Sequence, residues 1–196
     1  EFLEKAIYST NWESNKTQDE DIKKIREQYL LKINLISKLP YITDKMPLNF
    51  QWIGFIVNAF PEAKIIHLNR DPMAVCWSNY KINFATNGMG FSFNLVDIAK
   101  YYKLYEDLIN FWNLKFSKNI YNLNYENLTH NQEIETRKLL NYLGLDWEDA
   151  VLNFYKNKRV VKTASNAQIR KNIYQGSSEE WKKFEKWLQP IKKNLK

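Results

Sequence analysis

Apolar residues at spacings of three and four predict that most of this chain is helical. Thr17 is expected to cap the first long helix, which Leu39 and Pro40 end. Gly144 is expected to close a later helix, because glycine readily takes the left-handed conformation of a C-cap. The predicted helices after the first cover residues 49–59, 71–84, 95–112, 134–142, 146–155 and 177–188.

Between the helices, short apolar runs predict β-strands over residues 41–44, 65–68 and 120–125. The middle run, with Ile65, Ile66 and Leu68, is expected to be a buried strand. Because strands that alternate with helices favour a parallel sheet, the pattern predicts an α/β fold, a three-layer sandwich around a mostly parallel central sheet. The chain of 196 residues has a length that suits a single domain, 1–196.

The middle strand runs into a helix start at Arg70. Asp71 suits the N-cap, and Pro72 suits the first helical position, where no amide hydrogen is needed. The unpaired amides of a helix start and the forked charge of Arg70 both favour an anion. Ser78 lies two turns further along near the same face. We therefore predict a phosphate site at Arg70; the alternative is a surface cation, with Ser78 packed on the sheet.

Charge and composition narrow the ligand class. The chain has 29 basic and 22 acidic residues, a net charge of +7 that favours an anionic ligand or partner. Nucleic acid, a membrane surface and phosphorylated or sulfated small molecules stay open on charge alone. The single cysteine, Cys76, rules out an internal disulfide and a cysteine-built metal site, and the presence of only two histidines, His67 and His130, disfavours a zinc site. No apolar run reaches the ~20 residues of a membrane span and no signal peptide is visible, so a soluble chain is expected, with the cytoplasm as its expected location.

Several short motifs follow one another in a fixed order. They are 43–47 with Lys45, 70–72 with Ser78 further on, 125–128, 163–168, and 176–182 with Trp181. In this order and spacing they resemble the PAPS-dependent sulfotransferases, in particular the tyrosylprotein-sulfotransferase-like bacterial branch, over about residues 39–190. The resemblance implies a P-loop NTPase-like fold, PAPS (3'-phosphoadenosine 5'-phosphosulfate) as donor substrate, and no metal ion. This branch often follows tetratricopeptide repeats, which are therefore expected upstream in the parent protein.

The resemblance also implies roles for particular residues. Arg70 and Ser78 match the pair that holds the 3'-phosphate, and Lys45 and Ser165 match the two groups that stabilise charge in the transition state. The other expected nucleotide contacts are Tyr125, Ser165, Gln168, Arg170 and Lys171. The alternatives are a core tyrosine at Tyr125 and solvated cations at Arg170 and Lys171.

This sequence departs from the family pattern at several positions. Pro47 stands where the cytosolic enzymes place a catalytic histidine, and His67 is expected to belong to the core. The glycine-rich loop that grips the 5'-phosphosulfate is missing, so the amino-terminal part of the domain is expected to be absent. The general base is expected in that part, with Glu1 or Glu4 near it. Basic residues of the family fall at Ile82 and Glu180, where Lys81 and Lys182 are the nearby substitutes.

The resemblance thus implies a sulfotransferase that moves a sulfuryl group from PAPS to a hydroxyl of a peptide tyrosine, a sugar or a small molecule, releasing adenosine 3',5'-bisphosphate. One alternative is a nucleotide-binding but inactive module that lacks part of the donor site. Another is a basic nucleic-acid-binding domain, which the dispersed cations disfavour. The acceptor is expected to contact loops such as residues 87–92, whose shape the sequence does not specify.

Overall fold

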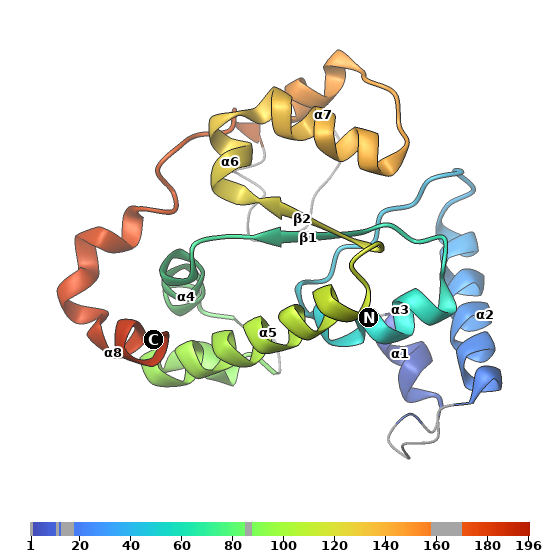
Figure 1. Ribbon diagram of the computed structural model, residues 1–196, viewed down its shortest axis with the longest axis horizontal. Helices are drawn as coiled ribbons and strands as arrows, with labels where there is room; N and C mark the ends of the chain where they lie inside the picture. The colour runs from blue at the N-terminus through green and yellow to red at the C-terminus, as the bar shows by residue number, and fades with distance from the viewer. Residues whose placement is uncertain (1, 11, 13–17, 85–87, 158–169) are drawn as a thin grey trace. The chain divides into compact units, whose positions relative to one another are not determined.

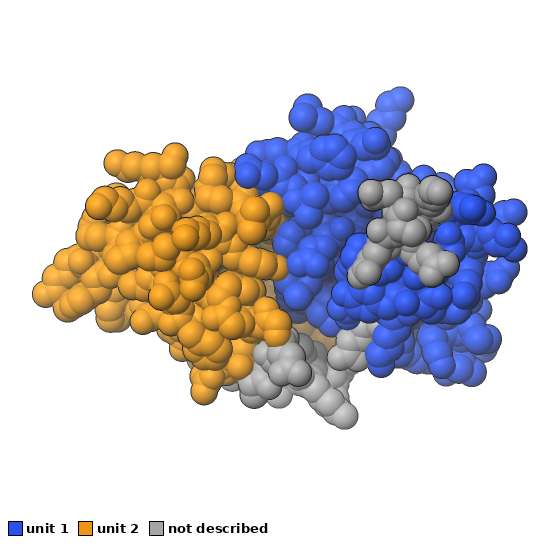
Figure 2. Space-filling view, turned by 90° about the horizontal axis from the view of Figure 1, so that it is seen from below, with its two compact units in different colours: residues 1–64, 107–119 blue, residues 65–106, 120–196 orange. Residues whose placement is uncertain are grey.

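The computed structural model describes residues 2–10, 12, 18–84, 88–157 and 170–196. Its contacts divide the chain into two compact units (Figure 2). Unit 1 holds residues 1–64 and 107–119, and unit 2 holds residues 65–106 and 120–196. Each unit is described by itself, and the single domain over residues 1–196 stays a prediction.

Unit 1 is helical within its described residues. Its core side chains come from the first helix, from the second helix and from residues 52–60; they are Leu3, Ala6, Ile7, Ile25, Trp52, Ala59 and Phe60. Its elements are α1 (Phe2–Tyr8), α2 (Asp19–Ile36), the 3-10 helix η2 (Pro47–Trp52), α3 (Ile53–Ala59) and the last part of α5 (Leu95–Lys115) (Figure 1).

The sequence predicts that α2 begins after a cap at Thr17 and ends at Leu39 and Pro40. Thr17 lies outside the described residues, and Gln18 is the N-cap, with its amide donating to Asp21 Oδ2 at 3.0 Å. The helix ends at Ile36, three residues before Leu39. The strand expected over residues 41–44 is wrong, because the described residues offer this segment no partner strand.

Gly54 is where unit 1 leaves no room for a side chain. A Cβ there would lie 2.9 Å from Trp112 Cη2, and the indole is held by its Nε1, which donates to the Phe50 carbonyl at 2.9 Å. We expect Gly54→Ala to lower the free energy of unfolding by about 1–2 kcal/mol, because overpacking outweighs the gain of about 1 kcal/mol in helix propensity. Urea denaturation measures this. Gly90→Ala, with open space around the new methyl group, is the matched control, and equal stabilities would contradict the prediction.

Unit 2 contains the sheet of the described chain. Strands β1 (Ile65–Asn69) and β2 (Ile120–Asn124) run parallel, from the pair Ile65 and Ile120 to the pair Asn69 and Asn124. Their carboxyl ends therefore lie side by side, β1 leading toward α4 and β2 into α6 (Figure 1). The remaining elements of unit 2 are α4 (Pro72–Tyr80), η3 (Gly90–Phe93), the first part of α5, α6 (Tyr125–His130), α7 (Gln132–Leu143), η4 (Asp149–Lys156), η6 (Glu180–Trp187) and α8 (Gln189–Asn194).

A second core lies in unit 2 between α4, α5 and the carboxyl-terminal helices. Its buried members are Met73, Cys76, Ile98, Ala99, Leu188 and Ile191. The core joins residues near the start of α4 to residues more than a hundred positions later, so the carboxyl-terminal segment is tied to the same part of the fold as Arg70. No described helix is long and apolar enough to cross a membrane.

The predicted fold class is confirmed in its coarser form, as a mixed α/β structure that is mostly helical with a small parallel two-stranded sheet. The three-layer sandwich stays a prediction. The strands predicted over residues 65–68 and 120–125 are present, and Gly144 closes α7 with a φ of 70°. The burial predicted for β1 is wrong at Ile66 and Leu68, which are 42% and 51% exposed, because successive strand residues face opposite sides and only the other side is covered.

Several helix boundaries also differ from prediction. The helix after Arg70 begins at Pro72 and ends at Tyr80, short of residue 84. The stretches expected to be α-helical at 146–155 and 177–188 are largely 3-10 helices, η4 and η6. Short 3-10 helices are frequent at helix ends and as connectors between elements.

Candidate functional site

The start of α4 is held by two carboxylates. Asp71 is the N-cap, as predicted, and its side chain accepts from the Ala74 amide at 2.7 Å. The Asp71 amide donates to Glu126 Oε1 at 3.1 Å, and Pro72 has no amide hydrogen. These amides are therefore already paired or absent. The expectation that unpaired helix-start amides are available to an anion is therefore wrong for Asp71 and Ala74.

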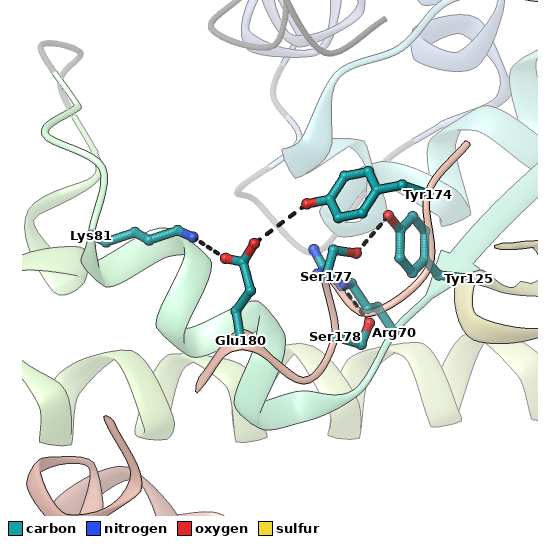
Figure 3. Close-up of polar contacts among 7 residues, drawn as sticks. All are labelled: Arg70, Lys81, Tyr125, Tyr174, Ser177, Ser178 and Glu180. Atoms are coloured by element: carbon teal, nitrogen blue, oxygen red, sulfur yellow. Dashed lines mark hydrogen bonds and ion pairs between the residues drawn. The ribbon is translucent and has the colours of Figure 1, made fainter. Parts of the chain in front are cut away.

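Arg70 lies at the carboxyl end of β1, over the ring of Tyr125 from the end of β2 (Figure 3). The guanidinium carbon is 4.6 Å from the ring centroid, a cation–π distance. Its Nε donates to Ser178 Oγ at 3.0 Å. Within the described residues, Nη1 and Nη2 of Arg70 form no hydrogen bond and no ion pair with a carboxylate. The sequence predicted both residues for one site, and the parallel strands bring them together.

Ser178 and Glu126 complete the surroundings of Arg70. The Ser178 hydroxyl donates to Glu126 Oε1 at 2.5 Å while it accepts from Arg70. Burial alone would raise the pKa of the Glu126 carboxyl, but the hydrogen bonds from Ser178 and from the Asp71 amide, together with the Arg70 charge, outweigh it and lower the pKa. Glu126 is therefore ionised at neutral pH, close to a guanidinium that it does not contact directly.

The segment from Tyr174 to Glu180 passes over this junction (Figure 3). Ser177 Oγ and the Tyr125 hydroxyl are 2.9 Å apart. Glu180 pairs with Lys81 at 2.8 Å and accepts from the Tyr174 hydroxyl at 3.4 Å. These contacts anchor the late segment to both strand ends and to the end of α4.

The two lysines suggested as substitutes for missing basic residues are both paired. Lys81 pairs with Glu180, and Lys182 pairs with Glu179 at 2.7 Å. Glutamates therefore neutralise both substitutes, and Arg70 is left as the cation at this junction whose fork is directed to no carboxylate among the described residues.

Six further residues are predicted for the site. Ser78 lies half-buried in α4, and Arg170 and Lys171 are exposed residues of unit 2. Lys45 is exposed in unit 1, between α2 and η2. Ser165 and Gln168 lie outside the described residues. The roles expected for these six residues stay predictions.

Sequence reasoning did not select Glu126, Ser177 or Ser178 as functional residues. Glu126 directly follows Tyr125 in a quoted motif, and the two serines follow Gly176 in another. A glutamate after a strand and serines before a helix are ordinary capping residues, so only their contacts with Tyr125 and Arg70 distinguish them.

His67 faces the covered side of β1. Its Nδ1 donates to Asn122 Oδ1 at 2.7 Å, and its Nε2 accepts from the Tyr105 hydroxyl at 2.5 Å. Burial lowers the pKa of His67, which favours the neutral ring that this pattern requires. Both ring nitrogens are used within the fold, in keeping with a core residue rather than a general base. Among the described residues, no group of three or more His, Cys, Asp or Glu side chains is placed to hold a metal ion.

Comparison with known proteins adds two findings. A model of the sulfotransferase family matches residues 4–149, a range that includes Lys45, Arg70, Tyr125 and Glu126 and ends before Ser178. An uncharacterized protein of Aquifex aeolicus (strain VF5) is 44% identical over 177 residues, which is 88% of this chain and 23% of that protein. The chain therefore spans about a quarter of the length of this relative.

Proposed function

The chain belongs to the sulfotransferase family, and we propose that it transfers a sulfuryl group from PAPS to a hydroxyl of an acceptor, releasing adenosine 3',5'-bisphosphate. The observation that carries this proposal is the environment of Arg70. Its guanidinium lies over Tyr125 at the carboxyl ends of two parallel strands, with both Nη atoms unused among the described residues. Ligands of open α/β sheets bind at such strand ends.

The donor set around Arg70 suits a phosphate group of the nucleotide. A guanidinium is permanently charged and presents two parallel N–H groups that match phosphate oxygens. The Tyr125 ring lies against one face of the guanidinium, and Ser178 occupies Nε, so the Nη edge is the part left for a ligand. We assign the 3'-phosphate of PAPS to this edge, with Ser78 as its second contact.

The remaining predicted residues have roles in the proposed reaction. Sulfuryl transfer, like phosphoryl transfer, needs alignment of donor and acceptor and neutralisation of charge on the leaving phosphate. Lys45 and Ser165 supply that neutralisation in this proposal, through an ammonium and a hydroxyl donor. Gln168, Arg170 and Lys171 extend the nucleotide contacts. The acceptor is a peptide tyrosine, a sugar or a small molecule, and its hydroxyl proton must pass to a general base.

A second candidate is a nucleotide-binding protein without transferase activity. It is favoured by the glycine content of the sequence, since none of the five glycines stands in a glycine-rich turn between a strand and a helix. Such a turn is the usual backbone cradle for the 5'-phosphate end of a nucleotide. Without it, bisphosphate binding through Arg70 would be retained while the transferred group was poorly held.

Supplying PAPS with three acceptor classes separates these candidates. The chain is incubated with PAPS and a tyrosine peptide, a sugar or a phenol, and adenosine 3',5'-bisphosphate is measured by chromatography. Bisphosphate formation that depends on one acceptor class is expected. Binding of bisphosphate by calorimetry without turnover would favour the second candidate, and the absence of both binding and turnover would contradict the two together.

A further inference from the structure

Ser178 separates two opposite charges that lie close together. Arg70 Nε donates to Ser178 Oγ at 3.0 Å, and the same oxygen donates its proton to Glu126 Oε1 at 2.5 Å. The guanidinium and the carboxylate are therefore bridged by one hydroxyl, and the described residues show no direct ion pair between them. In a half-buried site such charges attract strongly, and an arginine and a carboxylate readily form a two-pronged pair.

A direct pair with Glu126 would occupy the Arg70 guanidinium, which the proposed function needs for phosphate binding. A forked pair takes at least one Nη group of Arg70 and neutralises the guanidinium charge, so it competes with the 3'-phosphate assigned above to the Nη edge. The phosphate would then have to displace a carboxylate before it could bind. The Ser178 hydroxyl prevents this, because it satisfies Arg70 as an acceptor and Glu126 as a donor at the same time.

Both ends of this bridge are fixed by other contacts. Glu126 Oε1 also accepts from the Asp71 amide, and Tyr125 lies against the guanidinium. On the late segment, Ser177 meets the Tyr125 hydroxyl and Glu180 pairs with Lys81. Ser178 is thus held in position by its neighbours before any ligand arrives, which lowers the entropic cost of binding.

We propose that Ser178 is a positioning residue that keeps Arg70 from pairing with Glu126 and so makes the site selective for nucleotides with a 3'-phosphate. This inference rests on the proposed function. It adds that Ser178 keeps the Nη edge of Arg70 open for a ligand. Ser178, which sets the ligand preference in this proposal, lies outside the 4–149 family match.

The test compares two nucleotides that differ at the 3' position. Calorimetry measures the affinities of adenosine 3',5'-bisphosphate and adenosine 5'-phosphate for the wild-type chain, Ser178→Ala, Ser178→Thr, Glu126→Gln and the double variant S178A/E126Q. We expect Ser178→Ala to weaken bisphosphate binding about tenfold, with no change for the 5'-phosphate. Ser178→Thr, which keeps the hydroxyl, should stay within about threefold of wild type.

The Glu126 variants test the proposed reason for this loss. In the Glu126→Gln background, Ser178→Ala should cost less than about threefold, because the competing carboxylate is gone. Glu126→Gln alone should bind the bisphosphate at least as tightly as wild type, and this arm holds even if Ser178→Ala fails to fold. An equal loss for both nucleotides, the same loss in both backgrounds, or tenfold weaker binding by Glu126→Gln would overturn the proposal.

The outcomes also separate this inference from the function on which it rests. If the wild-type chain does not bind the bisphosphate, the proposed function fails. If the wild-type chain binds it and Arg70→Ala does not, while Ser178→Ala binds both nucleotides as wild type does, only the role of Ser178 is overturned.

Discussion

Replacing Arg70 with alanine is expected to weaken binding of adenosine 3',5'-bisphosphate by about 30-fold or more, equivalent to about 2 kcal/mol. The reason is that the variant loses a charge-assisted, forked contact with a phosphate, and Lys81 and Lys182 are already paired with glutamates. Arg70→Lys should recover only part of the affinity, since an ammonium lacks the planar fork. Titration calorimetry at fixed salt measures these affinities.

Arg137 offers a matched control in the same unit. Its guanidinium also lies over an aromatic ring, 3.8 Å from the centroid of Trp147, but it is exposed and paired with Glu133 at 2.7 Å. Arg137→Ala removes the same side chain and the same charge, so it should leave bisphosphate affinity unchanged. Wild-type affinity in Arg70→Ala, or an equal loss in both variants, would remove the phosphate site from Arg70.

Lys45→Ala is expected to lower turnover by about a hundredfold while nucleotide affinity stays within about twofold of wild type. An ammonium that contacts the leaving phosphate interacts most strongly as charge builds on that oxygen in the transition state, so its loss affects kcat more than ground-state binding. Lys45 is exposed in an irregular segment, so its truncation removes little packing. Initial rates at saturating PAPS, together with calorimetry on the same preparation, separate the two effects.

Lys38→Ala is the control for Lys45→Ala. Lys38 is an exposed lysine of the same segment, seven positions earlier in the sequence, and its removal makes the same change in net charge. It should turn over PAPS at the wild-type rate. Unchanged turnover in Lys45→Ala would clear Lys45 of the proposed role, and an equal fall in both variants would indicate a general effect of charge on this segment.

Among the site residues, the sequence motifs identified those that stand next to strand ends. Arg70 and Tyr125 each follow an apolar run that forms a strand, and parallel pairing of β1 with β2 brings them together. The motifs did not identify Ser178 and Glu126, the residues that surround Arg70 in the structure. Ser178 is 108 positions from Arg70 and 52 from Glu126, and no local pattern relates residues at such separations. Ser165 and Gln168 lie outside the described residues, so their predicted roles stay as the motifs gave them.

The sequence by itself determined features that depend on a few neighbouring residues. The Asp71 cap, Pro72 in the first turn and the left-handed Gly144 are local, because each is satisfied within one helical turn. Only the tertiary structure decided that residues 41–44 form no strand and that Ile66 and Leu68 face outward, since pairing and burial require a partner elsewhere in the chain. It also decided that a serine hydroxyl, rather than a carboxylate, meets Arg70, because packing of the carboxyl-terminal segment places that hydroxyl there.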